Sequence, residues 1–146
     1  MKKKLFLVVG RSNSGKDTLT KIMSEYYNIP IIVSLTDRPM RFGETEGIEH
    51  RFLTEKAFDS IIESEELLAY TKIENPKTHT KGYRYCVVKR DVDAIPRDKA
   101  FYIIDPNGIK YLKERYSDEY DNAEARDMGN DDLEMEQDMS DDFEDR

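Results

Sequence analysis

A glycine-rich segment near the N-terminus carries the clearest chemical pattern in the chain. Residues 10–18 read G-R-S-N-S-G-K-D-T, which nearly matches the phosphate-binding loop pattern G-x-x-x-x-G-K-[S/T]. Its glycines let the backbone curl so that successive N–H groups converge on phosphate oxygens, and a helix beginning near Lys16 adds the positive end of its dipole. The Lys16 ammonium can reach the β- and γ-phosphates. The pattern therefore predicts that a nucleoside triphosphate binds here.

One position of this loop departs from the pattern. The hydroxyl residue that usually follows the lysine is Asp17, and a hydroxyl returns one residue later in Thr18. Because Mg²⁺ prefers oxygen ligands, we expect Thr18 to help hold it, together with Asp17 or Asp105. Asp17 can instead weaken triphosphate binding by repulsion. The residues predicted to bind the triphosphate are Gly10, Ser12, Asn13, Ser14, Gly15, Lys16, Asp17 and Thr18.

A polar segment, residues 34–51, contains a second group with chemical potential. Arg38 and Arg41 lie three residues apart within it. Two guanidinium groups can clamp a phosphate dianion bidentately and orient it for in-line attack. On their own, two such arginines are more often surface charges, so their assignment depends on the surrounding motif.

The elements that must position these residues follow from the hydrophobic pattern. Short apolar runs predict strands at residues 5–9, 31–33, 67–73, 82–88 and 101–104. Helical spacing predicts helices from Lys16 to before Asn28, from Thr54 with Phe58, Ile61 and Ile62 facing inward, and from Ile109 to Tyr116. A polar loop is expected at residues 74–81. Strands that alternate with helices predict a three-layer α/β fold with a parallel sheet.

Charge is divided unevenly along the chain. Residues 117–146 contain 14 acidic residues and two arginines, a net charge of −12, which leaves +4 for residues 1–116. A mildly basic body suits anionic substrates. The sequence shows no basic stripe interleaved with aromatic residues, so we expect no nucleic-acid partner. The apolar runs are far shorter than the roughly 20 residues of a membrane span. A single cysteine, Cys86, is compatible with the cytoplasm.

The polar segment also resembles a known family. Residues 33–44, V-S-L-T-D-R-P-M-R-F-G-E, resemble the guanylate kinase signature V-S-x-T-T-R-x-x-R-x-G-E, and residues 47–52, 66–70, 82–85 and 104–108 continue in the family's order. The resemblance covers roughly residues 3 to 116. It implies a P-loop NTPase fold for residues 1–116, with a small monophosphate-binding subdomain inserted at about residues 34–88. It also implies that ATP, with Mg²⁺, phosphorylates GMP, dGMP or a related nucleoside monophosphate.

By this resemblance, one set of side chains holds the acceptor phosphate: Ser34, Arg38, Arg41, His50 and Tyr85. His50 stands where the family has a tyrosine, and it can still donate a hydrogen bond. The family's guanine-reading glutamate aligns with Ala69, so the choice of base stays open, although Glu65, Glu66 or Glu74 can substitute. Where the family motif D-I-D-x-x-G has its first aspartate, this chain has Ile103. Asp105 is therefore the one aspartate of the motif that this chain keeps.

The C-terminal residues match the family least. Residues 125–133 resemble the family's arginine-rich lid but keep only Arg126, which we predict to be catalytic together with Lys16. The core strand that precedes the lid in the family is expected to be absent between Tyr116 and Ala125. Residues 117–146 are then an acidic, lid-like or partly disordered segment. Two alternatives stay open: a catalytically impaired nucleotide-binding or interaction module, and a deoxynucleoside monophosphate kinase with altered base choice.

Overall fold

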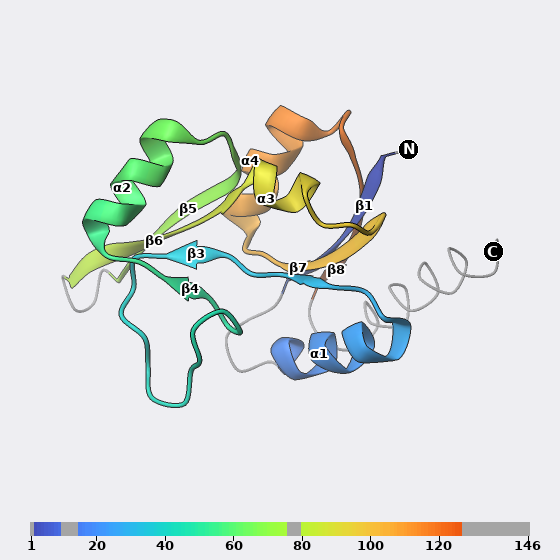
Figure 1. The fold of residues 1–146 in the computed structure, drawn as a ribbon, viewed down its shortest axis with the longest axis horizontal. Coiled ribbons are helices and arrows are strands. Elements are labelled where there is room, and N and C mark those ends of the chain that lie inside the picture. The colour runs from blue at the N-terminus through green and yellow to red at the C-terminus, as the bar shows by residue number, and fades with distance from the viewer. Residues whose placement is uncertain (1, 10–14, 76–79, 127–146) are drawn as a thin grey trace. The chain divides into compact units, whose positions relative to one another are not determined.

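The computed structural model of the protein describes residues 2–9, 15–75 and 80–126, and Figure 1 labels its helices and strands. The side chains of residues 16, 75, 80, 81, 125 and 126 are outside this description. The described residues fall into two units. The first unit draws on the described residues within Met1–Ile32, Arg97–Ile109 and Tyr116–Arg146, and the second on those within Val33–Pro96 and Lys110–Arg115.

A parallel sheet forms the first unit, as the sequence predicts. Its strands are β1 (Lys3–Val9), β2 (Ile31–Ile32), β7 (Lys99–Ile103) and β8 (Tyr120–Arg126), in the order β2-β7-β1-β8. Phe6 lies beside Phe101 in the register of β1 and β7, and both side chains are fully buried. They form a core with Val8, Met23, Ile29 and Ala123 on one face of the sheet.

Helix α1 (Lys16–Tyr27) follows β1 and contributes Met23 to this core. Gly15 precedes the helix in the left-handed region, at φ +84°, which glycine adopts without steric cost. Asn28 ends the helix, also left-handed at φ 55°, and its N–H donates to the Ser24 carbonyl. The predicted end of this helix at the Asn28-Ile29-Pro30 sequence is therefore confirmed.

Strand β8 corrects one expectation. The core strand expected to be absent between Tyr116 and Ala125 is present, because β8 pairs with β1 in parallel from Lys3 opposite Tyr120 to Val9 opposite Arg126. Its sequence Y-D-N-A-E-A-R has no β-branched residue, and Tyr120 and Ala123 are the buried ones among its described side chains. Backbone pairing with β1, which composition does not reveal, makes it a strand.

The second unit contains a mixed sheet of short and long strands. These are β3 (Leu35–Thr36), β4 (Arg51–Phe52), β5 (Leu67–Asn75) and β6 (Thr80–Val88), in the order β4-β3-β6-β5. Strand β6 is antiparallel to both β3 and β5, whereas β3 and β4 are parallel. The sequence predicts β5 and β6 but not β3 and β4, since two residues are too few to show a period.

Helix α2 (Glu55–Ser64) packs on this sheet, alongside β5 and β6 in Figure 1. The Thr54 side chain caps it by accepting a hydrogen bond from the Ala57 N–H at 3.1 Å, as the sequence predicts for the start of this helix. Phe58 is fully buried with Leu35, Leu67, Cys86 and Val88, and Ile61 and Ile62 pack against them. Burial raises the pKa of the Cys86 thiol to about 12, so the thiol stays protonated.

Two further helices complete the described elements. The short α3 (Lys89–Asp93) was not predicted from the sequence. Helix α4 (Pro106–Tyr116) begins three residues before the predicted start at Ile109. The Asp105 carboxylate accepts a hydrogen bond from the Gly108 N–H at 2.8 Å, and Pro106 occupies the first turn, where no N–H is needed. The Asp-Pro-Asn-Gly sequence therefore forms the start of the helix, which the sequence analysis placed at Ile109.

Candidate active site

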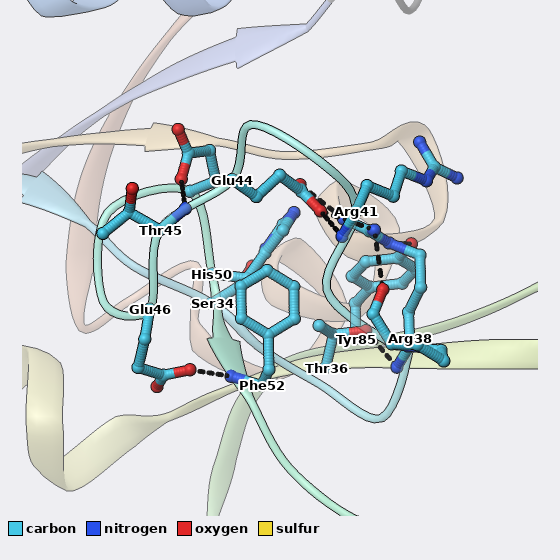
Figure 2. Close-up of polar contacts among 12 residues, drawn as sticks. Ser34, Thr36, Arg38, Arg41, Glu44, Thr45, Glu46, His50, Phe52 and Tyr85 are labelled. Atoms are coloured by element: carbon cyan, nitrogen blue, oxygen red, sulfur yellow. Dashed lines mark hydrogen bonds and ion pairs between the residues drawn. The ribbon is translucent and has the colours of Figure 1, made fainter.

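Arg38 is the centre of the polar contacts in the second unit, although only 5% of its surface is exposed. Its Nη1 and Nη2 atoms donate to the two carboxylate oxygens of Glu44 at 2.9 and 2.8 Å, and its Nε donates to the Tyr85 hydroxyl at 3.1 Å (Figure 2). A guanidinium that is held on two sides in this way has a fixed orientation. The structure therefore holds the side chain of Arg38, one of the residues predicted from the sequence, in a fixed orientation.

The position of Arg38 follows from strand pairing. Thr36, the last residue of β3, lies directly opposite Tyr85 on β6. The Thr36 hydroxyl donates to the Arg84 carbonyl at 2.8 Å and accepts from the Arg38 N–H at 3.1 Å. Since Thr36 is fully buried, these bonds fix the backbone from which the Arg38 side chain extends.

Ser34 and His50 extend this group of contacts from Tyr85. The Ser34 hydroxyl and His50 Nδ1 are 2.8 Å apart, and the His50 ring packs against the ring of Tyr85 with centroids 5.5 Å apart. The His50 ring also meets Phe52 edge-on at 5.9 Å. Four of the five side chains predicted to hold an acceptor phosphate are thus connected through direct contacts: Ser34, His50, Tyr85 and Arg38.

Arg41, the fifth predicted side chain, is exposed. Its backbone N–H donates to Glu44 Oε1 at 2.6 Å, whereas its guanidinium extends away from that carboxylate (Figure 2). Within the described part of the chain, no acidic side chain pairs with the guanidinium of Arg41. One carboxylate therefore fixes both the Arg38 side chain and the Arg41 backbone, and leaves the charge of Arg41 open to a ligand.

Glu44 is a site residue to which the sequence reasoning gave no role. Its hydrogen bonds with the Arg38 guanidinium lower the pKa of the Glu44 carboxyl from 4.5 to about 2, so the carboxylate is ionised at neutral pH. The same bonds raise the pKa of Arg38. Glu44 belongs to the R-x-G-E part of the motif quoted above, and its place six residues after Arg38 in one loop is the signal that could have identified it.

A second, partly buried ion pair, also not predicted, lies next to Tyr85. Arg84 donates from Nε to Asp37 Oδ2 and from its backbone N–H to Asp37 Oδ1, both at 2.7 Å. Its Nη1 donates to Asp59 Oδ1 on α2 at 2.6 Å, and its guanidinium lies 4.5 Å from the ring centroid of Phe58. This clasp, Arg84 with Asp37 and Asp59, connects the end of β3 and strand β6 to α2.

The residues predicted to bind the triphosphate belong to the first unit. Gly10, Ser12, Asn13 and Ser14 lie outside the described residues. Gly15 precedes α1, Lys16 is its first residue, and Asp17 and Thr18 are exposed in its first turn. The buried strand β1 therefore ends at Val9 and the helix begins at Lys16, in the order that the glycine-rich pattern requires. The contacts of these residues with a triphosphate stay predictions.

The residues proposed as oxygen ligands of Mg²⁺ differ in exposure and in the hydrogen bonds they already make. Asp17 and Thr18 are exposed, whereas one Asp105 oxygen is engaged in capping α4. The described residues contain no cluster of three or more His, Cys, Asp or Glu that could hold a metal ion. Mg²⁺ in phosphoryl-transfer sites usually takes one or two carboxylates together with waters and substrate phosphates, so Asp17 and Thr18 fit such an ion.

Two other positions bear on the predicted chemistry. Arg126, predicted as a lid residue, is the last residue of β8 and lies opposite Val9 at the end of β1. Its side chain is outside the described part, so its catalytic role stays a prediction. Ala69 lies on β5 opposite Val87, and each is 2% exposed.

Comparison with known proteins gives one consistent result. The family model "Guanylate kinase" matches residues 2–119. A guanylate kinase of Fusobacterium nucleatum is 29% identical over 114 residues, which are 77% of this chain and 58% of that protein. A guanylate kinase of Nitrobacter winogradskyi is 32% identical over 119 residues, covering 79% and 51%. The chain thus spans between half and three fifths of the length of these relatives.

A solved structure shows the same fold. The crystal structure of guanylate kinase from Anaplasma phagocytophilum superimposes with a TM-score of 0.61 at 20% identity, covering 86% of this chain and 60% of that one. This likeness confirms the predicted α/β fold class with a parallel sheet. No helix within the described residues is long and apolar enough to cross a membrane.

Proposed function

The chain belongs to the guanylate kinase family, and from that premise we propose that it transfers the γ-phosphate of ATP to GMP, dGMP or a related nucleoside monophosphate. One observation carries the proposal: the contacts among Ser34, His50, Tyr85 and Arg38. A phosphate placed among them would meet hydroxyl, imidazole and guanidinium donors from three separate stretches of the chain. Phosphoryl transfer depends mainly on such positioning and on neutralisation of charge.

The two arginines divide the work on the acceptor phosphate. Arg38 is buried and oriented by Glu44 and Tyr85, so it fixes the direction of the phosphate. Arg41 is exposed and carries its charge into solvent, so it attracts the incoming dianion. The acceptor's own phosphate oxygen is the nucleophile, and no covalent enzyme intermediate is required.

ATP is assigned to the loop that precedes α1. Lys16 stands at the N-terminus of this helix, where free backbone N–H groups and the helix dipole favour phosphate. When bound there, Mg²⁺ would neutralise charge on the β- and γ-phosphates, with Thr18 and Asp17 as its protein ligands and Asp105 as a further candidate. Arg126 is the remaining candidate for stabilising charge on the transferred group.

A second function, a binding module without catalysis, has an observation in its favour. The chain spans only 58% and 51% of two guanylate kinase relatives, so much of their length lies outside the matched residues. Such a module would still bind ATP and a monophosphate. It differs from a kinase only in turnover.

A panel assay on the full chain separates these functions. ADP release is measured with ATP, Mg²⁺ and each ribo- or deoxynucleoside monophosphate in turn, with Lys16→Ala as the matched inactive control. We expect turnover with at least one monophosphate and none in the control. Binding of ATP and of a monophosphate by calorimetry, without ADP release for any acceptor, would establish the binding module instead.

A further inference from the structure

Thr71 on β5 carries a hydroxyl that none of the contacts described above uses. Its residue surface is 6% exposed, and within the described part of the chain its Oγ1 atom is buried without a hydrogen-bond partner. Burial of a hydroxyl without a partner costs free energy, and native proteins leave few such groups. A ligand that offers a partner to Oγ1 would recover that cost.

The place of Thr71 in the sheet connects it with the phosphate-binding residues. In the antiparallel pairing of β5 with β6, Thr71 lies directly opposite Tyr85, and Tyr85 lies directly opposite Thr36 on β3. Residues directly opposite each other project from the same face of a sheet. Thr36, Tyr85 and Thr71 therefore form one row across three strands, and Figure 2 shows the Thr36 and Tyr85 end of this row beside Arg38.

The other two hydroxyls of the row have partners. Thr36 bonds to the backbone of Arg84 and Arg38, and the Tyr85 hydroxyl accepts from Arg38 Nε. Only the Thr71 hydroxyl in this row has no partner among the described residues. It is thus the next polar group along the row, on the strand beyond Tyr85.

Beyond Tyr85, the neighbours of Thr71 on the same face toward Ala69 are apolar. Two residues back along β5 lies Ala69, which is opposite Val87 on β6, and both side chains are 2% exposed. By the family resemblance, Ala69 stands where the guanine-reading glutamate would be, whereas Tyr85 belongs to the phosphate group. Thr71 therefore lies between the phosphate-binding position and the base-reading position, with an apolar pair in place of the carboxylate.

We propose that the Thr71 hydroxyl hydrogen-bonds the base of the acceptor monophosphate and is a specificity-determining residue of this chain. The proposal rests on the proposed function, because it needs the acceptor phosphate at Arg38. A hydroxyl both donates and accepts, whereas a carboxylate only accepts. Thr71 therefore selects among bases by one neutral hydrogen bond, which corresponds to a factor of about two to twelve in affinity.

The test measures acceptor binding to the full chain without ATP. Calorimetric titrations with GMP, dGMP, AMP, CMP and UMP are made for wild type, Thr71→Val and Thr71→Ser. Valine keeps the shape and removes the hydroxyl, whereas serine keeps the hydroxyl. We expect Thr71→Val to bind the preferred base about two- to twelvefold more weakly and to lose selectivity across the panel, while Thr71→Ser keeps the wild-type order of bases.

A structural role for Thr71 gives a different result. Removal of an unpartnered buried hydroxyl should leave the unliganded chain at least as stable, so the thermal midpoint of Thr71→Val should not fall. If Thr71→Val does not fold, the pair Thr71→Ser and Thr71→Ala isolates the hydroxyl in the same way. Wild-type affinities in Thr71→Val, an equal loss for every base, or a loss that depends on the 2′-hydroxyl in GMP against dGMP would overturn the proposal. A wild type that binds none of the five monophosphates would overturn the proposed function itself, and this inference with it.

Discussion

The ion pair of Arg38 with Glu44 gives the two arginines of the candidate site different properties. Arg38 is buried and its fork already contacts a carboxylate, whereas Arg41 is exposed and contacts Glu44 only through its backbone. An incoming phosphate must share or replace the Glu44 contact at Arg38. Substitution of Arg38 therefore affects both the ligand and the folded chain, while substitution of Arg41 affects the ligand alone.

The two arginine variants test this difference. A charge-assisted contact with phosphate contributes about 1.5–3 kcal/mol, so each alanine variant should lower kcat/KM for the acceptor by roughly ten- to more than a hundredfold. Arg38→Ala should also lower the free energy of unfolding, because it leaves the Glu44 carboxylate without its partner. Arg41→Ala should unfold as wild type does. Steady-state kinetics and urea unfolding measure the two effects, and equal stability of both variants would contradict the role given to Glu44.

Glu44→Gln tests the ion pair through pH. The pKa of Glu44 is lowered from 4.5 to about 2 in the folded chain, so its stabilising contribution is complete above pH 4.5 and is lost as the pH falls toward 2. We expect the variant to be less stable than wild type by about 1–3 kcal/mol at pH 7, with a difference that shrinks between pH 4.5 and 2. Urea unfolding of both proteins across this range measures it. A difference that does not change with pH would mean that the carboxylate charge contributes nothing.

The residues of the proposed acceptor site were predictable from the sequence because they belong to its motifs. Ser34, Arg38, His50 and Tyr85 belong to motifs in a fixed order, and the structure brings them together. Glu44 was not assigned a role, although it lies six residues after Arg38 in the same loop. Thr71 was not assigned one because its place opposite Tyr85 depends on strand register. No spacing in a single sequence specifies that Thr71 faces Tyr85.

Among the elements, β3, β6 and α2 are fastened by the clasp of Arg84 with Asp37 and Asp59. Asp37 stands where the family signature has threonine, and its side chain is 3% exposed. The clasp joins the chain neighbours of two residues of the proposed acceptor site, since Tyr85 follows Arg84 and Arg38 follows Asp37. It should therefore influence both the stability of the chain and the position of the phosphate-binding groups.

Asp37→Asn tests the clasp. The amide keeps the shape but removes the charge opposite Arg84, so we expect a loss of about 1–3 kcal/mol in the free energy of unfolding and a higher KM for the acceptor. The matched control is Asp93→Asn on α3, which breaks the more exposed pair with Lys89 and should change stability by less than about 1 kcal/mol. Urea unfolding and acceptor titration measure the effects. Equal effects of the two substitutions would show that the clasp has no special role.

The sequence predicted the helices whose own residues show a clear hydrophobic pattern. It did not predict the strand that forms only through backbone pairing with another strand. Helices α1 and α2 have apolar residues at helical spacing and recognisable ends, so their positions follow from local chemistry. Strand β8 has a largely polar sequence and exists through its register with β1. Helix α4 starts early because Asp105 caps it, a contact that the Asp-Pro-Asn-Gly sequence also allows in a turn.

For the molecule as a whole, the proposed ligands are assigned to different units. The residues predicted for ATP lie in the first unit, and the residues for the acceptor monophosphate lie in the second. The order of motifs along the sequence was enough to predict the fold class, because strand, glycine-rich loop and helix follow one another in a way that few α/β folds share. The matched part of the chain covers 58% and 51% of two relatives, and transfer requires that both ligands be bound at the same time.

Lys16→Ala and Arg38→Ala together test the assignment of one ligand to each unit. In the proposed function Lys16 contacts the β- and γ-phosphates of ATP. Its removal should therefore abolish phosphoryl transfer and weaken ATP binding by roughly tenfold or more, while the acceptor binds with wild-type affinity. Arg38→Ala should do the reverse, weakening the acceptor and leaving ATP binding unchanged. Calorimetric titration of each variant with ATP, and separately with the monophosphate preferred by the wild type, measures all four affinities. Unchanged ATP binding in Lys16→Ala would refute the phosphate-binding loop, and loss of both ligands in either variant would mean that the two sites are not independent. A fully separated pattern would place donor and acceptor on different parts of the chain, as transfer between two bound nucleotides requires.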